Sequence, residues 1–267
     1  MEVHAHTHTP LDPDPSTSLP TGKAGSGHRK KWTHYFWEFL MLFLAVFCGF
    51  LAENQREHMI EHKREKKYME TLLEDLIRDS VDLHYDIIFW DSKIRKLDTI
   101  KAELNKKPAE RDEVLLYRCM ATMSSGNSFL YHDRTVSQLK NSGNFRLIRK
   151  NNISDSLANY DAYINNTLRP VMQNFRENRI YYMHMQNRFF NSEYFVLANQ
   201  PHLFDSAVAS RPDIIAMRNR DEDLFFEYCN ELNGIADGYR FLNVMNRTLI
   251  RRASNLINLI KKEYHLK

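Results

Sequence analysis

The sequence predicts an all-α protein in which one transmembrane helix near the N-terminus continues into a bundle of long helices. Three observations support this fold class. An uncharged apolar run extends from Phe39 to Ala52. After this run, apolar residues recur at steps of three and four over several long segments, which is the spacing of one helix face. Strand and helix patterns do not alternate along the sequence, so we expect no parallel sheet.

The chain is expected to have four parts. Residues 1–31 form a disordered cytoplasmic tail, residues 32–52 the transmembrane helix, residues 53–67 a charged helical stalk and residues 68–267 a helical bundle domain. The tail is rich in Pro, Gly, Ser and Thr, and such a segment buries too little apolar surface to fold. Unstructured imidazoles bind metal ions weakly, so we interpret the tail's alternating His4, His6 and His8 as solvated side chains.

The apolar run alone is shorter than the roughly 20 residues that a spanning helix needs. Aromatic residues precede it, as they do at a membrane interface, and extend it to about 21 residues with Glu38 at headgroup depth. A carboxylate inside a membrane is a candidate functional group, but Glu38 beside three aromatics is better explained as an edge residue. The predicted anchor residues are Trp32, Tyr35, Trp37, Glu38, Phe39 and Ala52.

Other interpretations of the run are a cleaved signal peptide, a helix in the core of a soluble protein and a pilin-type leader. A signal peptide needs small residues before its cleavage point, where Phe47, Phe50 and Leu51 stand. A pilin leader ends in Gly shortly before the acidic residue, and Thr33 and His34 occupy those places. An uncleaved anchor therefore fits the sequence best.

Flanking charges predict the orientation of the anchor. Arg29, Lys30 and Lys31 lie directly before Trp32, whereas only Arg56 lies close after the run. Positively charged flanks stay in the cytoplasm, so we expect the N-terminus inside and the bundle domain outside the cytoplasm.

Composition excludes several classes of function. The 37 Lys and Arg residues nearly balance the 34 Asp and Glu residues, which gives no general case for nucleic-acid binding. Three cysteines exclude a disulfide framework, and no C-x-x-C pair indicates zinc or redox chemistry. Cys119 and Cys229 lie on predicted helices without turn chemistry that would bring them together, so we expect two free, buried thiols.

The first part of the domain reads as one long helix. Residues 53–67 are almost wholly charged, which is typical of a solvent-exposed helix. A stripe of apolar residues that must pack on other helices follows, and Pro108 ends the helix. Its members are Met69, Leu73, Leu76, Ser80, Leu83, Ile87, Trp90, Ile94 and Leu97.

The middle of the chain predicts shorter elements. A helix is expected from Glu113 to Ser124, and a second one through residues 135–140, capped by Asp133 and ended at Gly143. Ser154 then begins a long helix that Pro170 kinks. We expect a loop from Pro201 to Pro212.

The last helix has the clearest pattern, with apolar residues at steps of three and four over five heptads. Gly234 and Gly238 fall inside it, and we interpret them as places where a neighbouring helix approaches closely, with a turn at Asn233-Gly234 as the alternative. Asn246 is the amide on this seam; it either lies buried and fixes register, or meets solvent. The seam residues are Phe225, Leu232, Tyr239, Asn246, Leu249 and Leu256.

Two blocks carry a resemblance to a known family. The first is WTHYFWEFL at 32–40, followed by AENQ at 52–55 and REK at 64–66, and the second is TVSQLKNSGNF at 135–145. In these blocks the chain resembles an uncharacterised family of single-span membrane proteins of Bacteroidota, over most of the sequence after Arg29. The resemblance implies a bacterial envelope protein with a helical domain, and it implies no activity. With the orientation expected from the flanking charges, we expect an inner-membrane protein whose bundle domain lies in the periplasm.

One short motif has catalytic precedent. Residues 58–62 match H-x-x-E-H, in which two histidines ligate zinc and the glutamate acts as a base. Such enzymes need a further acidic ligand and an enclosing domain, whereas this motif lies on the polar stalk. We therefore treat His58, Glu61 and His62 as weak metal-ligand candidates, and we expect neither catalytic residues nor a cofactor.

These features predict a membrane-anchored interaction or scaffolding protein. Its partners would be the lipid bilayer and either a second copy of the chain or another envelope protein. The alternative is a sensory or ligand-binding bundle, whose sign would be a polar cluster inside the core; the Ser/Asn-rich segment from Ser124 to Asn144 is the candidate. A zinc-dependent hydrolase using the H-x-x-E-H match is the third interpretation.

Overall fold

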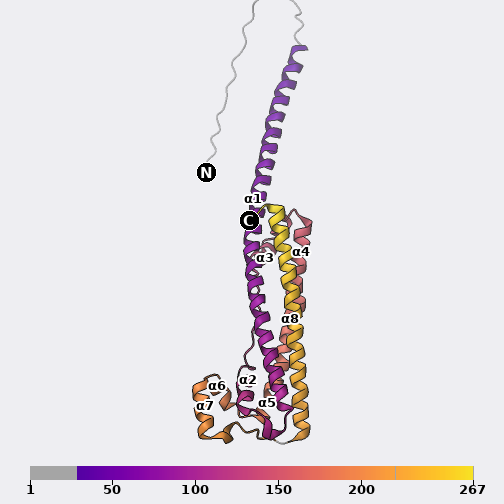
Figure 1. Cartoon of the computed structure of the whole chain (residues 1–267). Coiled ribbons are helices and arrows are strands. Elements are labelled where there is room, and N and C mark those ends of the chain that lie inside the picture. The colour runs from indigo at the N-terminus through magenta and orange to yellow at the C-terminus, as the bar shows by residue number, and fades with distance from the viewer. Residues whose placement is uncertain (1–28, 220, 267) are drawn as a thin grey trace, which may run out of the picture. The chain divides into compact units, whose positions relative to one another are not determined.

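The chain folds almost entirely into α-helices. The computed structural model describes residues 29–219 and 221–266, and none of these residues lies in a β-strand. The chain divides after His58 into two units. Residues 1–28 of the expected tail, with His4, His6 and His8, lie outside the described residues. The predicted fold class, a long N-terminal helix that leads into a helical bundle, is confirmed (Figure 1).

Helix α1 runs from Arg29 to Leu104 and contributes to both units. Within the described residues it begins at Arg29, before the expected membrane span, and Arg and Lys are good helix formers that are compatible with this extension. It ends before Pro108, as predicted. The described side chains that precede Met59 are exposed from Trp32 onward, apart from the half-buried Leu40.

The predicted stalk, residues 53–67, is helical, but its second half is not wholly exposed. The second unit begins at Met59, inside the stalk. Glu65 is only 2% exposed and accepts hydrogen bonds from the backbone N–H of Arg149 and from Tyr264 Oη, at 2.8 and 2.6 Å. The expectation that every charge of this segment meets solvent is therefore wrong for Glu65, whose hydrogen-bond donors come from distant parts of the chain.

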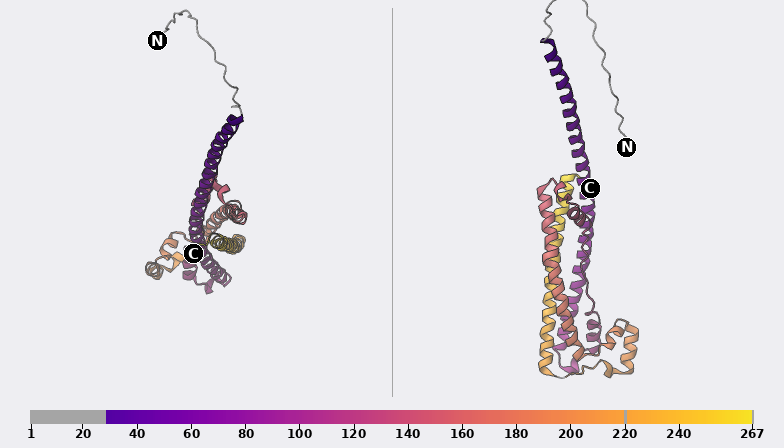
Figure 2. Two further views of the ribbon diagram at one scale, coloured as in Figure 1. Left: turned by 90° about the horizontal axis from the view of Figure 1, so that it is seen from above. Right: turned by 180° about the vertical axis from the view of Figure 1, so that it is seen from behind.

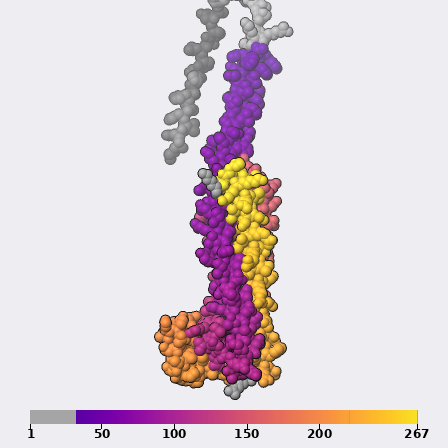
Figure 3. Space-filling model, in the orientation of Figure 1, coloured from indigo at the N-terminus to yellow at the C-terminus, as the bar shows by residue number. Residues whose placement is uncertain are grey.

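Three long helical segments form the second unit. They are residues 59–104 of α1, a run composed of α4 (Asn151–Tyr163), the π-helical turn η3 (Ile164–Leu168) and α5 (Arg169–Phe189), and finally α8 (Glu222–Tyr264). Both α4 and α5 pack against α8 (Figures 1 and 2). Figure 3 shows α1 and α8 next to each other along one face of this unit.

Pro170 explains why the second segment is not one regular helix. It lies in the first turn of α5, directly after the π-helical turn. Proline lacks the backbone N–H that the preceding turn requires, and its ring clashes with the carbonyl four residues earlier, so an extra residue is accommodated here. The segment begins at Asn151, slightly earlier than the expected Ser154.

Short helices connect the long ones. They are α2 (Glu113–Ala121), α3 (Arg134–Asn141), α6 (Glu193–Ala198) and α7 (Pro201–Ser210), with the 3-10 turns η1 (Pro108–Glu110), η2 (Asn144–Leu147) and η4 (Pro212–Ile215). Helices α2, α6 and α7 pack together at the end of the unit where α1 ends (Figure 1). The predicted stop at Gly143 is confirmed, with a left-handed φ of 65°.

Two details of these connections differ from the prediction. The loop expected between Pro201 and Pro212 is largely helix α7, because proline is compatible with the first turn of a helix and Phe204 is fully buried. Asp133 stands at the start of α3, but its carboxylate accepts from Ser137 Oγ at 3.0 Å and caps no backbone N–H.

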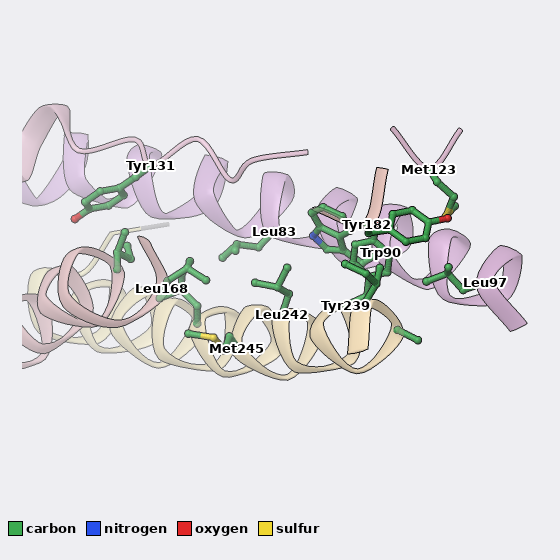
Figure 4. Packing of buried hydrophobic residues seen from close by; sticks show 14 of the residues in the cluster. Leu83, Trp90, Leu97, Met123, Tyr131, Leu168, Tyr182, Tyr239, Leu242 and Met245 are labelled. Atoms are coloured by element: carbon green, nitrogen blue, oxygen red, sulfur yellow. The ribbon is translucent and has the colours of Figure 1, made fainter. Parts of the chain in front are cut away.

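The core lies between α1, α5 and α8. Leu83 and Trp90 of α1 point toward Leu242 and Tyr239 of α8 (Figure 4). The rings of Trp90 and Tyr239 stack with their centroids 4.9 Å apart. Burying large aromatic side chains in this way contributes much of the stability of a bundle. The apolar stripe predicted on α1 therefore does face the core.

Helix α8 is continuous through both of its glycines, so the alternative of a turn at Asn233-Gly234 is wrong. A Cβ atom at Gly238 would lie 2.3 Å from Cε2 of Phe175, and only a glycine lets α5 approach so closely. At Gly234 a Cβ would meet nothing within 4 Å. The predicted close approach is thus confirmed at Gly238 and not at Gly234.

These two glycines provide a matched pair of substitutions. We expect Gly238→Ala to lower the free energy of unfolding by roughly 1–3 kcal/mol, because the methyl group forces Phe175 away from Trp90 and Tyr239. Gly234→Ala should raise it by about 0.5–1 kcal/mol through helix propensity alone. Urea unfolding of the two variants measures both effects. Equal effects of the two substitutions would contradict this packing.

Candidate functional site

The predicted anchor residues all lie on α1 in the first unit, and all are exposed: Trp32, Tyr35, Trp37, Glu38, Phe39 and Ala52. An 18-residue window of this helix has a mean hydropathy of 2.0 and is nowhere buried. By length and composition, this is the one helix in the described part of the chain that could cross a membrane. Glu38 lies within 3.3 Å of His34, which gives its carboxylate a local partner.

The H-x-x-E-H residues do not assemble a metal centre. The boundary between the two units falls directly after His58. Glu61 lies 3.5 Å from an Arg149 nitrogen, and His62 Nδ1 lies 3.3 Å from Glu65. Within the described residues, no group of three or more His, Cys, Asp or Glu side chains is arranged to hold a metal ion.

The seam predicted on α8 faces the bundle interior. Leu232, Tyr239, Leu249 and Leu256 are buried, and Phe225 is half-buried. Asn246 is 2% exposed, so the alternative in which it meets solvent is wrong. The apolar seam residues Leu232, Tyr239, Leu249 and Leu256 belong to the hydrophobic core of this unit.

Both cysteines of the bundle are free thiols, as predicted. Cys119 is buried, whereas Cys229 is half-buried and therefore differs from the expectation. Burial raises the pKa of both thiols, so they are poor nucleophiles at neutral pH.

A row of buried ionisable side chains on α1 is the main feature that the sequence analysis missed. Glu65, Asp79, Asp86 and Lys93 are each at most 3% exposed. They are spaced by multiples of seven residues, which places them on one face of the helix. Charged residues at heptad spacing beside an apolar stripe are the signal that could have revealed this row.

The row binds the polar connector that follows α2. Asp79 accepts from the backbone N–H of His132 and from Tyr160 Oη, both at 2.8 Å. Asp86 accepts from Asn127 Nδ2. Asp75, one turn before Asp79, accepts from the N–H of Thr135 at 3.0 Å and from its hydroxyl at 2.5 Å. The Ser/Asn-rich segment that was the candidate for an internal polar cluster thus provides donors to α1.

Burial shifts the acid–base properties of this row toward neutral pH. It raises the pKa of Asp79 to about 6 and that of Asp86 to about 6, because the charged carboxylate loses solvent. Burial also raises the pKa of Tyr160, beside Asp79. At the other end of the row, burial lowers the pKa of Lys93 to about 8, and the nearby Lys96 and Arg179 add to this shift.

A second face of α1 is apolar but exposed. Ile77, Val81, Tyr85 and Ile88 are 44–66% exposed, and we call them the α1 stripe. With Ile257 of α8 they line a groove with a volume of about 610 Å³. Contiguous apolar surface of this kind marks an interaction site in soluble parts of proteins.

Comparison of the chain with protein-family models, with curated proteins and with solved structures finds no match. The resemblance to the Bacteroidota family therefore stays a prediction.

The raised pKa of Asp86 predicts how stability depends on pH. Its folded-state pKa of about 6 exceeds the ordinary value of 3.8, so the folded protein binds more protons between these values and loses stability as the pH rises through this window. Asp86→Asn removes this loss and keeps an oxygen that accepts from Asn127. We expect it to stabilise the full chain in detergent by roughly 1 kcal/mol at pH 8, after allowance for partial solvent screening, and hardly at all at pH 4.

Urea unfolding at several pH values measures this difference. The control is Asp155→Asn, which changes an exposed carboxylate on α4 and should have no comparable pH-dependent effect. A stabilisation by Asp86→Asn that is equal at pH 4 and pH 8 would show that desolvation of the charge is not its cause.

Proposed function

We propose that this chain is a membrane-anchored interaction protein of the bacterial inner membrane, whose helical domain acts by binding other protein helices. The observation that carries this proposal is the α1 stripe on the surface of a domain that follows a helix able to cross a membrane. A large exposed apolar surface costs solubility, and its usual compensation is contact with a partner.

The orientation that we propose places the N-terminus in the cytoplasm and the helical domain in the periplasm. Support comes from the three consecutive cations Arg29, Lys30 and Lys31 before the apolar run, compared with the single nearby Arg56 after it. The bacterial setting rests on the resemblance described above.

The partner that we propose for the α1 stripe is a second copy of the chain. Three residues of the stripe, together with the adjacent exposed His84, lie at steps of four, three and four residues, which is the spacing of a coiled-coil seam. The four seam positions are Ile77, Val81, His84 and Ile88. Such a seam accepts a helix by inserting side chains between those of the partner. A seam of this kind favours a helical partner over a small ligand.

Anchoring in one bilayer selects how two copies would meet. Both α1 helices enter from the same membrane with the same direction, and the same number of residues separates Ala52 from Ile77 in each. Two stripes are therefore parallel and in register, so each seam residue meets its own counterpart. The four seam positions contain neither a carboxylate nor a Lys or Arg. In this arrangement no two such charges of equal sign therefore face each other across the seam.

A seam of two heptads is too short for a strong dimer in solution, since stable interfaces bury about 1,200 Å² or more. The membrane compensates for this, because anchoring confines the chains to two dimensions and raises their effective concentration. The contact is accordingly expected in membranes and weak in dilute detergent.

Disulfide cross-linking in membranes tests this proposal. In a chain whose native cysteines are replaced (Cys48→Ser, Cys119→Ala, Cys229→Ser), Val81→Cys should give a cross-linked homodimer under mild oxidation. Asp155→Cys, an exposed position on α4, should not. Adding Ile88→Asp to Val81→Cys should reduce the dimer at least about tenfold, because a buried charge pair of equal sign costs more than 1.4 kcal/mol.

The matched control for Ile88→Asp is Val196→Asp, which changes an exposed apolar residue on α6 (71% exposed, against 54% for Ile88) and should leave cross-linking unchanged. Equal cross-linking of the Val81→Cys and Asp155→Cys chains would contradict a specific seam. Cross-linking of the Val81→Cys chain to a different protein would contradict a second copy as the partner.

A further inference from the structure

Four cationic side chains gather around the connector between α2 and α3. Lys93 Nζ contacts the carbonyl of Thr122 and donates to Ser125 Oγ at 2.7 Å, and Lys96 Nζ donates to Thr122 Oγ1 at 2.8 Å. From α5, Arg179 Nη1 donates to the carbonyl of Ser124 at 2.7 Å. All these acceptors are uncharged oxygens.

No carboxylate neutralises this group. Among the described residues, none of these four cations, of which Arg176 of α5 is the fourth, forms an ion pair with a carboxylate. Other cations of the same unit do, for example Lys101, Arg118 and Lys150, each with an acidic partner within 4 Å. Lys93 is only 3% exposed, so its charge is removed from water without a compensating negative charge. Such an arrangement is costly, and a bound anion would offset the cost.

A pocket lies beside these cations. It has a volume of about 220 Å³, and its lining includes Arg176 and Arg179 together with Gly126, Asn127 and Ser128 of the connector. Apolar side chains, among them Trp90 and Phe175, line it as well. The pocket therefore combines cationic and hydrogen-bonding groups with aromatic rings.

Gly126 lies directly against the guanidinium of Arg179 in this pocket. A Cβ atom there would lie 2.6 Å from Nη1 and 3.1 Å from Cζ of Arg179, so glycine allows the guanidinium to lie against the connector backbone. The guanidinium is held in place by the carbonyl of Ser124 as well. A guanidinium fixed in this way presents its remaining N–H groups with little loss of conformational entropy on binding.

We propose that this pocket binds a small organic anion, with its carboxylate or phosphate group on Arg176 and Arg179 and its apolar part against Trp90 and Phe175. Guanidinium groups match carboxylate and phosphate oxygens in geometry and charge. Lys93 and Lys96 lie outside the pocket lining. They donate to Ser125 and Thr122 of the connector and add positive electrostatic potential near the pocket. This site goes beyond the proposed interaction function and does not depend on the α1 stripe.

Asp86 of α1 accepts a hydrogen bond from Asn127, which lines the pocket. Burial raises the pKa of Asp86 to about 6 and lowers that of Lys93 to about 8, so at pH 5 the carboxylate is largely neutral and the lysine fully charged. Both changes favour an anion, and a carboxylate ligand should bind more tightly at pH 5 than at pH 8. A phosphate monoester is unsuitable for this comparison, because its own second negative charge is lost as the pH falls through about 6.

Tryptophan fluorescence of the full chain in detergent provides the test. Replacing Trp32 and Trp37 by Phe leaves Trp90, at the pocket, as the only tryptophan of the three in the chain. Phenyl phosphate and benzoate are the probes, because each joins an anion to an aromatic ring, and benzyl alcohol is the neutral control. We expect a saturable change with at least one of the two anions and none with benzyl alcohol; the tighter anion identifies the group that the pocket prefers.

Charge variants then locate the site. Arg176→Gln and Arg179→Gln together should weaken binding of the anion at least about tenfold. Lys96 does not line the pocket, and Lys93 still holds the connector when Lys96 is replaced. Lys96→Gln should therefore weaken anion binding about threefold, through the loss of a more distant, partly screened charge. Arg251→Gln, at an exposed position on α8, should have no effect.

Three results would overturn the proposal. These are the absence of a saturable change with both anions, an equal change with benzyl alcohol, and an anion affinity of the Arg176→Gln/Arg179→Gln chain equal to that of the Arg251→Gln chain.

Discussion

The register of α1 is the constraint on which the rest of the second unit depends. Heptad spacing aligns an apolar stripe that includes Leu83 and Trp90, and beside it a row of buried ionisable groups from Glu65 to Lys93. The apolar stripe packs against α8, and the row provides acceptors and a donor to the connector and an acceptor to Tyr160 of α4. A shift of one residue would rotate both faces by about 100° and remove both sets of partners.

Local patterns in the sequence were sufficient to predict the long helices. The periodicity of α8, the stop at Gly143 and the interruption at Pro170 each depend on residues close in sequence. The buried row could not be found in this way, because its partners lie far away: Tyr160 is 81 positions from Asp79. Charges on a helix were read as solvent-exposed by default, and Glu65 shows why this default fails when a distant backbone N–H supplies a donor.

The candidate sites were predictable only in part, for the same reason. The Ser/Asn-rich segment was recognised as a polar candidate, but the cations that surround it come from α1 and α5. The α1 stripe could not be recognised in the sequence, because its residues alternate along the same helix with apolar core residues such as Leu83 and Trp90. Only the packing of the bundle shows which of the two faces is buried. Asn127 connects the two polar features, since it contacts Asp86 and also lines the pocket.

The proposed anchor matters to the proposed seam, because a short apolar seam forms a dimer only where copies are concentrated and aligned. The most direct test of the central claim, a domain anchored outside the cytoplasm, is a reporter fused after Lys267 of the full chain. The account predicts activity of a reporter that works only in the periplasm, and a lower or mixed signal when Arg29, Lys30 and Lys31 are replaced by neutral residues. Activity solely from a reporter that works in the cytoplasm would contradict it.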